Sequence, residues 1–174
     1  MTGKQRFLNA IGSKETDRQS VHPAIDVCYA AARAGFGVGK CFMRPDLHAY
    51  ALSSVFESHP DIDGLYVNLC LCPDACVNVW EEGDCFYAKD SGGMTWAAPG
   101  NDIGSVKARE ITELGDARLL SQNPLKDGIL ETFKRIPQDI KNTYMIVPGL
   151  TGPYSNFMTC NDIRKLTHYC IEAG

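Results

Sequence analysis

The sequence lacks the features of a membrane or nucleic-acid-binding protein. No apolar run approaches the ~18 residues that indicate a membrane-spanning helix. Lys and Arg number 17 against 21 Asp and Glu, the formal net charge is −4, and no basic cluster is present. We therefore expect neither nucleic acid nor an anionic membrane surface as a partner. The first ten residues contain no apolar core of the kind found in signal peptides, which predicts a cytoplasmic protein.

Nucleotide-binding motifs are also lacking. Residues 35–40, GFGVGK, contain three glycines at alternate positions. This spacing fits neither the Walker phosphate loop nor the dinucleotide-binding fingerprint. We interpret the segment as a flexible connection.

What the chain does contain is typical of one globular domain. It has 174 residues, of which 44% are hydrophobic and 22% charged, enough for a sizeable core. We therefore treat residues 1–174 as a single domain. The eight cysteines are expected to be reduced, because a chain of this length without a secretion signal has little need of disulfides.

Residues 61–74, DIDGLYVNLCLCPD, are the most strand-like run in the chain. Alternation predicts a strand over residues 65–72 with two largely apolar faces, as expected for a parallel strand that is covered on both sides. One face would carry Leu65, Val67, Leu69 and Leu71, and the other Tyr66, Asn68, Cys70 and Cys72. The polar atoms lie toward the C-terminal end, where parallel α/β folds bind ligands.

The beginning of the chain predicts a capped helix followed by a strand. Thr2 and Gln5 have the spacing of a capping box, so we expect a helix over residues 3–11 and then a first strand over residues 21–27. The side chains expected to face the core from this helix are Phe7, Leu8 and Ile11.

The rest of the pattern predicts alternating helices and strands with one β-hairpin. Pro45 fits the first turn of a helix, and His48 is expected on the solvent side of that helix. The β-α-β order from about residue 20 to residue 72 favours parallel pairing of the strand over 21–27 with the strand over 65–72, through a right-handed crossover. The expected elements are helices over 29–34, 45–57, 125–135 and 153–173, a hairpin formed by 85–89 and 94–97, and a buried strand over 144–147.

Three closely spaced cysteines invite a metal interpretation. Cys70, Cys72 and Cys76 form a C-x-C-x3-C pattern, but common zinc modules use other spacings. We interpret these cysteines as core residues and predict no metal site in this chain.

Several stretches together resemble the N-terminal half of the uroporphyrinogen decarboxylase superfamily, which includes methylcorrinoid-dependent methyltransferases. The resemblance extends over nearly the whole chain. The opening QRFLNAIGSKETDRQSV is similar through Arg6, Phe7, Leu8, Ala10, Asp17 and Arg18. The stretch CFMRPDLHAYALSSVFESHPDIDGLYVNLCLCPDA is similar to the second helix and strand of the family, with Pro73 following the strand. VPGLTGPYSNFM, at residues 147–158, resembles its third segment.

This resemblance implies a partial (β/α)8 TIM barrel. Such a barrel typically takes ~250 residues, and the chain supplies three of its eight strands. We therefore expect the N-terminal half of a barrel with a β-hairpin inserted after the second strand. A truncated, fragmented or naturally split protein would expose sheet edges. Self-association or pairing with a missing C-terminal half is therefore expected.

The resemblance also implies two alternative activities for a longer parent protein. Decarboxylases of the family place an Asp at the end of the second strand, and the matching residue here is Asn68. An amide lacks the negative charge of that Asp, so we favour methyl transfer from a methylcorrinoid protein over uroporphyrinogen decarboxylation. The zinc ligands of the methyltransferases belong to the second half of the family sequence. Zinc and methylcorrinoid are thus expected only for the parent, and this chain alone is expected to bind no cofactor and to be inactive. A non-catalytic half that needs a partner is the third alternative.

Two candidate catalytic residues and four substrate-binding residues follow. Asn68 is the first, and Asp26 ends the predicted first strand as a general acid or base, a substrate partner or the N-cap of the next helix. Arg33, with Arg44 as an alternative, would meet substrate carboxylates.

The other candidates are expected near the ends of the second and third strands. Tyr154 would stack on a planar tetrapyrrole or corrinoid ligand, beside Thr151. Cys72 shares the face of Asn68 in the predicted strand.

Overall fold

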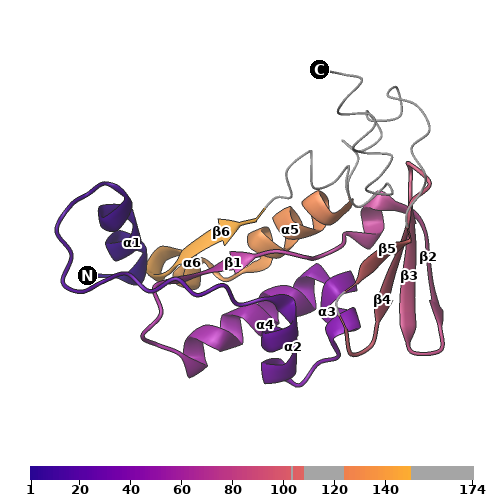
Figure 1. Ribbon diagram of the computed structural model, residues 1–174, viewed down its shortest axis with the longest axis horizontal. Coiled ribbons are helices and arrows are strands. Elements are labelled where there is room, and N and C mark those ends of the chain that lie inside the picture. The colour runs from indigo at the N-terminus through magenta and orange to yellow at the C-terminus, as the bar shows by residue number, and fades with distance from the viewer. Residues whose placement is uncertain (103, 108–123, 150–174) are drawn as a thin grey trace, which may run out of the picture.

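A computed structural model describes residues 1–102, 104–107 and 124–149, which form a mixed α/β structure (Figure 1). Its helices are α1 (Gly3–Ile11), α2 (Val27–Ala34), α3 (Val38–Met43), α4 (Pro45–Ser58), the 3-10 turn η1 (Pro73–Ala75), α5 (Pro124–Arg135) and α6 (Gln138–Thr143). Its strands are β1 (Gly64–Val67), β2 (Cys76–Glu82), β3 (Cys85–Asp90), β4 (Thr95–Pro99), β5 (Ser105–Lys107) and β6 (Met145–Pro148).

The strands form two separate sheets. β1 and β6 pair in parallel, with Leu65 opposite Ile146. The prediction paired this strand instead with one over residues 21–27, which the structure does not contain. β2, β3, β4 and β5 form an antiparallel sheet in that order. The antiparallel sheet and α1 lie at opposite ends of the molecule (Figure 1). Within the described residues the sheets do not close into a barrel.

Helices cover one face of the parallel pair. Leu65, Val67 and Ile146 are buried in one cluster with Val55 of α4 and Ile129 of α5. On the other face Tyr66 is 36% exposed, opposite Val147. The prediction that both faces are covered is therefore wrong for the described part of the chain.

The predicted strand over residues 65–72 is too long. β1 ends at Val67, and Leu69 has a φ of 48°, a left-handed conformation that ends the alternation of an extended strand. Cys70 is then buried with its Sγ 3.6 Å from the carbonyl oxygen of Cys41 in α3. α5 passes so close that a Cβ at Gly128 would overlap the backbone of Cys70.

The predicted first strand, over residues 21–27, is absent. Val21 lies beside the start of β1, where its carbonyl oxygen accepts from the Asp63 N–H at 2.7 Å. However, the N–H of Val21 donates to the Asp63 carboxylate at 2.8 Å, so a side chain uses a donor that a ladder would need. α2 begins at Val27, because Asp26 caps it by accepting from the Tyr29 N–H at 3.1 Å.

The predicted hairpin is confirmed and belongs to a larger sheet. β3 and β4 pair antiparallel around the turn at residues 91–94. Asp90, buried at that turn, accepts from the Met94 N–H at 2.8 Å and from the Trp96 Nε1–H at 3.2 Å. β2 and β5, which extend the hairpin on both sides, were not predicted.

The predicted bounds of the helices agree with the structure better than the predicted sets of buried side chains. α1 has the predicted bounds, and Thr2 caps it by accepting from the Gln5 N–H at 3.2 Å. Its predicted inner face is wrong, because Leu8 and Ile11 are 46% and 69% exposed whereas Arg6 is buried. α4 agrees with prediction except that His48, expected in solvent, is fully buried.

The later elements agree where they are described. α5 and β6 match the predicted helix over 125–135 and strand over 144–147 within a residue or so. The segment 35–40, interpreted as a flexible connection, instead contains the first half of α3. The predicted helix over 153–173 lies outside the described residues. Among the described helices, none has both the length and the apolar character needed to cross a membrane.

Candidate functional site

Asn68 follows the C-terminal end of β1 directly. Its side-chain oxygen Oδ1 is buried and has no hydrogen-bond partner within the described part of the chain. The next residue, Leu69, has a positive φ, which is uncommon for a side chain of this kind. The adjacent strand β6 ends beside it, since the Gly149 N–H donates to the Val67 carbonyl oxygen at 2.8 Å. An unpaired buried polar atom next to a strained residue is typical of functional sites.

Asp26 and Arg33 lie on α2, where both have structural partners. Asp26 is the N-cap, one of the three roles left open by the sequence. The Arg33 Nε–H donates to the Ser58 hydroxyl at 2.9 Å, which links α2 to the end of α4. Thr151 and Tyr154 lie outside the described residues.

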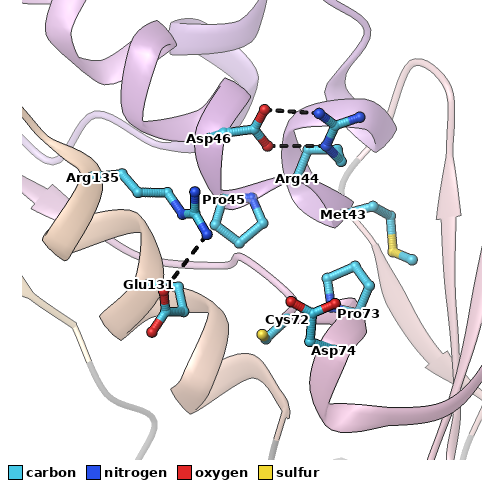
Figure 2. Close-up of a pocket in the computed structure, with 9 residues that line it drawn as sticks. All are labelled: Met43, Arg44, Pro45, Asp46, Cys72, Pro73, Asp74, Glu131 and Arg135. Atoms are coloured by element: carbon cyan, nitrogen blue, oxygen red, sulfur yellow. Dashed lines mark hydrogen bonds and ion pairs between the residues drawn. The ribbon is translucent and has the colours of Figure 1, made fainter.

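Cys72 lies in a cavity between the start of α4, the η1 turn and α5, with a volume of about 340 Å³ (Figure 2). Cys72 and Arg44, the alternative to Arg33, are the predicted site residues that line this cavity, among those the structure describes. The prediction placed Cys72 and Asn68 on one face of an extended strand. The left-handed conformation of Leu69 ends that alternation, so the two residues no longer share a strand face. The lining residues are Met43, Arg44, Pro45, Asp46, Cys72, Pro73, Asp74, Glu131 and Arg135.

Two ion pairs shape the electrostatics of this cavity. Arg44 binds Asp46 through Nε at 2.9 Å and Nη2 at 2.8 Å, and this pairing lowers the pKa of Asp46. Glu131 accepts from Lys134 Nζ at 2.7 Å and lies 3.7 Å from Arg135 Nη2. The hydrogen bond from Lys134 is the main cause that lowers the pKa of Glu131. The carboxylates of Asp46 and Glu131 are therefore charged at neutral pH.

The nearby thiols are poor nucleophiles at neutral pH. Burial raises the pKa of Cys70 to about 12 and that of Cys76 to about 12. Burial also raises the pKa of Cys72. Since the thiolate is the reactive form, these cysteines are suited to packing. No group of three or more His, Cys, Asp and Glu that could hold a metal ion occurs among residues 1–102, 104–107 and 124–149.

The sequence did not predict the cavity. Asp46, Asp74, Glu131 and Arg135 were not identified, because they come from three elements whose contacts depend on tertiary packing. One local signal was present: Glu131 and Arg135 are four residues apart, the spacing that places side chains together on a helix.

No family model matches the chain, no curated protein matches it and no solved structure matches it.

Proposed function

We propose that the chain is the N-terminal part of a uroporphyrinogen decarboxylase-like (β/α)8 protein whose activity is methyl transfer from a methylcorrinoid. In this proposal Asn68, at the end of β1, contacts the corrinoid. Porphyrinogen decarboxylation is the competing activity.

The unpaired Oδ1 of Asn68 is the observation that carries the proposal. A buried amide oxygen without a partner costs free energy, and that cost is recovered when a ligand donates a hydrogen bond to it. Corrinoids carry several amide side chains that can both donate and accept. An Asn complements such groups, whereas an Asp suits pyrrole N–H donors, since a carboxylate only accepts.

The environment of β1 is consistent with a strand of a larger α/β fold. Its face toward α4 and α5 is buried, while the face of Tyr66 is partly exposed. In a (β/α)8 barrel the first kind of face is directed to the helices and the second to the interior. Val21 beside the start of β1 has the place that a preceding strand would take.

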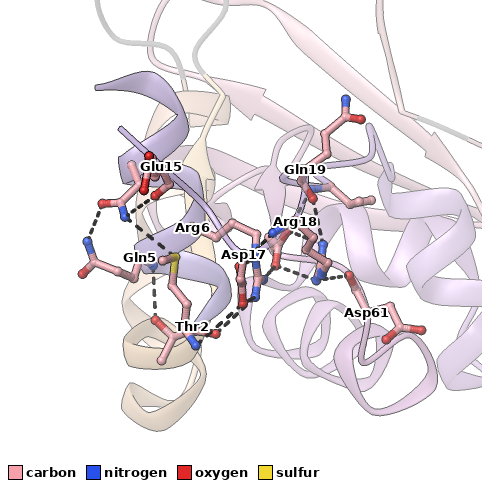
Figure 3. Close-up of polar contacts among 12 residues, drawn as sticks. Thr2, Gln5, Arg6, Glu15, Asp17, Arg18, Gln19 and Asp61 are labelled. Atoms are coloured by element: carbon pink, nitrogen blue, oxygen red, sulfur yellow. Dashed lines mark hydrogen bonds and ion pairs between the residues drawn. The ribbon is translucent and has the colours of Figure 1, made fainter. Parts of the chain in front are cut away.

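The residues that carry the resemblance at the N-terminus also share one structural role. Arg6 donates to Asp17 through Nε at 2.6 Å and Nη2 at 2.8 Å (Figure 3). It also donates to buried Asp63. Arg18 donates to Asp63 at 2.9 Å. This network fastens the N-terminal segment to the start of β1, at the opposite end of the strand from Asn68. We therefore interpret the residues of this network as structural. In the proposal the ligand binds at the C-terminal end of β1, beside Asn68.

Equilibrium dialysis of methylcobalamin and of uroporphyrin against the purified chain tests the proposal. The sequence alone predicts no bound cofactor for this chain, but the unpaired Oδ1 of Asn68 changes that expectation. We therefore expect methylcobalamin to bind the wild type and to bind Asn68→Ala roughly tenfold more weakly, the value of one well-placed hydrogen bond. Asn68→Asp should also weaken methylcobalamin binding but strengthen uroporphyrin binding. Asn78→Ala, on exposed β2, is the matched control and should bind like the wild type. Methylcobalamin affinity that is insensitive to Asn68 would contradict the proposal.

A further inference from the structure

The cavity at Cys72 has two charged groups that its own ion pairs do not satisfy. Arg44 donates two short hydrogen bonds to the carboxylate of Asp46, so the charges of this pair balance each other. The charge of Glu131 is balanced mainly by Lys134, at 2.7 Å. Arg135 and Asp74 remain as the groups that can bind something else.

Asp74 is the available anion. It lies on the η1 turn, its side chain is exposed, and its carboxylate makes no hydrogen bond or ion pair within the part of the chain that the structure describes. In Figure 2 this carboxylate is directed into the space between η1 and α5.

Arg135 is the available cation. Its contact with Glu131 is 3.7 Å long, which exceeds a normal N–H···O hydrogen bond, so most of the five guanidinium donors remain free. It extends from α5 on the opposite side of the cavity from Asp74 (Figure 2). The cavity lining also includes the apolar rings of Pro45 and Pro73 and the thiol of Cys72.

We propose that this cavity binds a small zwitterion with its ammonium at Asp74, its carboxylate at Arg135 and a short apolar linker between them. A volume of about 340 Å³ lies near the lower end of the range for small-molecule sites, so the ligand is of amino-acid size. Asn68 does not line this cavity. The zwitterion proposal therefore does not depend on the function proposed for Asn68.

Three compounds with a six-carbon chain test the proposal: 6-aminohexanoate, which has both charges, hexanoate, which has only the carboxylate, and hexylamine, which has only the ammonium. Titration of ¹⁵N-labelled protein followed by NMR gives both the affinity and the place of binding. We expect 6-aminohexanoate to shift the amide signals of η1 and α5 saturably. Each singly charged compound should bind more weakly, by up to about fivefold, because one exposed ion pair contributes up to about 1 kcal/mol.

Two variants separate the charges. Asp74→Asn should lower the affinity for 6-aminohexanoate and hexylamine but not for hexanoate. Arg135→Gln should lower it for 6-aminohexanoate and hexanoate but not for hexylamine. Both side chains are exposed, so folding is expected to be unaffected. Asp139→Asn and Lys126→Gln, which are exposed residues that do not line the cavity, are the matched controls.

The proposal fails if 6-aminohexanoate does not bind saturably, or if it binds no better than the singly charged compounds. It also fails if the two variants do not show these opposite selectivities.

Discussion

Asp63 connects three segments of the chain. Its buried carboxylate accepts from Arg6, from Arg18 and from the backbone N–H of Val21. The family resemblance singled out Arg6 and Arg18 in the sequence. No local sequence pattern, however, indicates that both side chains bind Asp63. The helix pattern therefore assigned Leu8 and Ile11 to the core, whereas the structure exposes both and buries Arg6.

Replacing Asp63 tests this network. Asp63→Asn leaves two guanidinium groups short of their charge partner, so we expect a loss of about 3 kcal/mol in the free energy of unfolding. Urea denaturation followed by circular dichroism measures it. Asp61→Asn, two residues away and exposed, should change stability by less than about 0.5 kcal/mol. Equal effects of the two substitutions would show that Asp63 is not the centre of the network.

Asp17 makes the network dependent on pH. The hydrogen bond from Arg6 holds the pKa of Asp17 well below its usual value of 3.8. A lowered pKa in the folded state stabilises the protein above that usual value, and the stabilisation is lost as the pH falls below it. Urea midpoints at about pH 6 and about pH 2.5 should therefore differ less for Asp17→Asn than for the wild type. If the difference between the two urea midpoints is the same in Asp17→Asn as in the wild type, Asp17 does not contribute to the loss of stability in acid. Asp61→Asn serves as the control.

At the scale of elements, hydrophobic periodicity and capping residues predicted most of the helices and strands that form. They did not predict where β1 ends or why the expected first strand is absent. α1, α4, α5, the hairpin and β6 follow from local pattern. β1 stops early because of the left-handed Leu69, and the predicted first strand is lost because Asp63 takes the N–H of Val21. Both depend on tertiary contacts. The same reason explains the candidate site: Asn68 follows from a strand end, whereas the cavity requires α4, η1 and α5 to meet.

The contact of α5 with the segment after β1 gives an element-scale prediction. A Cβ at Gly128 would overlap the carbonyl oxygen of Cys70 and the carbonyl carbon of Leu71. Gly128→Ala should therefore destabilise the protein by about 1–3 kcal/mol, although helix propensity alone favours Ala by about 1 kcal/mol. Lys126→Ala, on the exposed side of α5, should be nearly neutral. A stabilised Gly128→Ala variant in thermal or urea unfolding would mean that α5 packs less closely than described.

At the scale of the whole molecule, β2 is an edge of the antiparallel sheet with no further strand beside it among residues 1–102, 104–107 and 124–149. Val77 and Val79 of this strand are 66% and 44% exposed, and an apolar edge strand is a template for pairing with another chain. We expect the weight-average mass in sedimentation experiments to rise with protein concentration. The double substitution Val77→Lys and Val79→Lys should suppress this rise, because charges on an edge oppose pairing. A wild type that stays monomeric at every concentration would contradict this expectation.

The two ends of the β1 strand have different roles in this account. The start of β1 is fastened by the network around Asp63, and its end is left with an unpaired amide at Asn68.

The most direct measurement is the NMR signal of the Asn68 side-chain amide, assigned by its loss in Asn68→Ala, during titration with methylcobalamin. The account predicts a saturable shift of this signal and of the backbone amides of residues 66–69, with the signals of the Asp63 network unchanged. Saturable binding of methylcobalamin that leaves the Asn68 amide unshifted, or no binding at all, would contradict it.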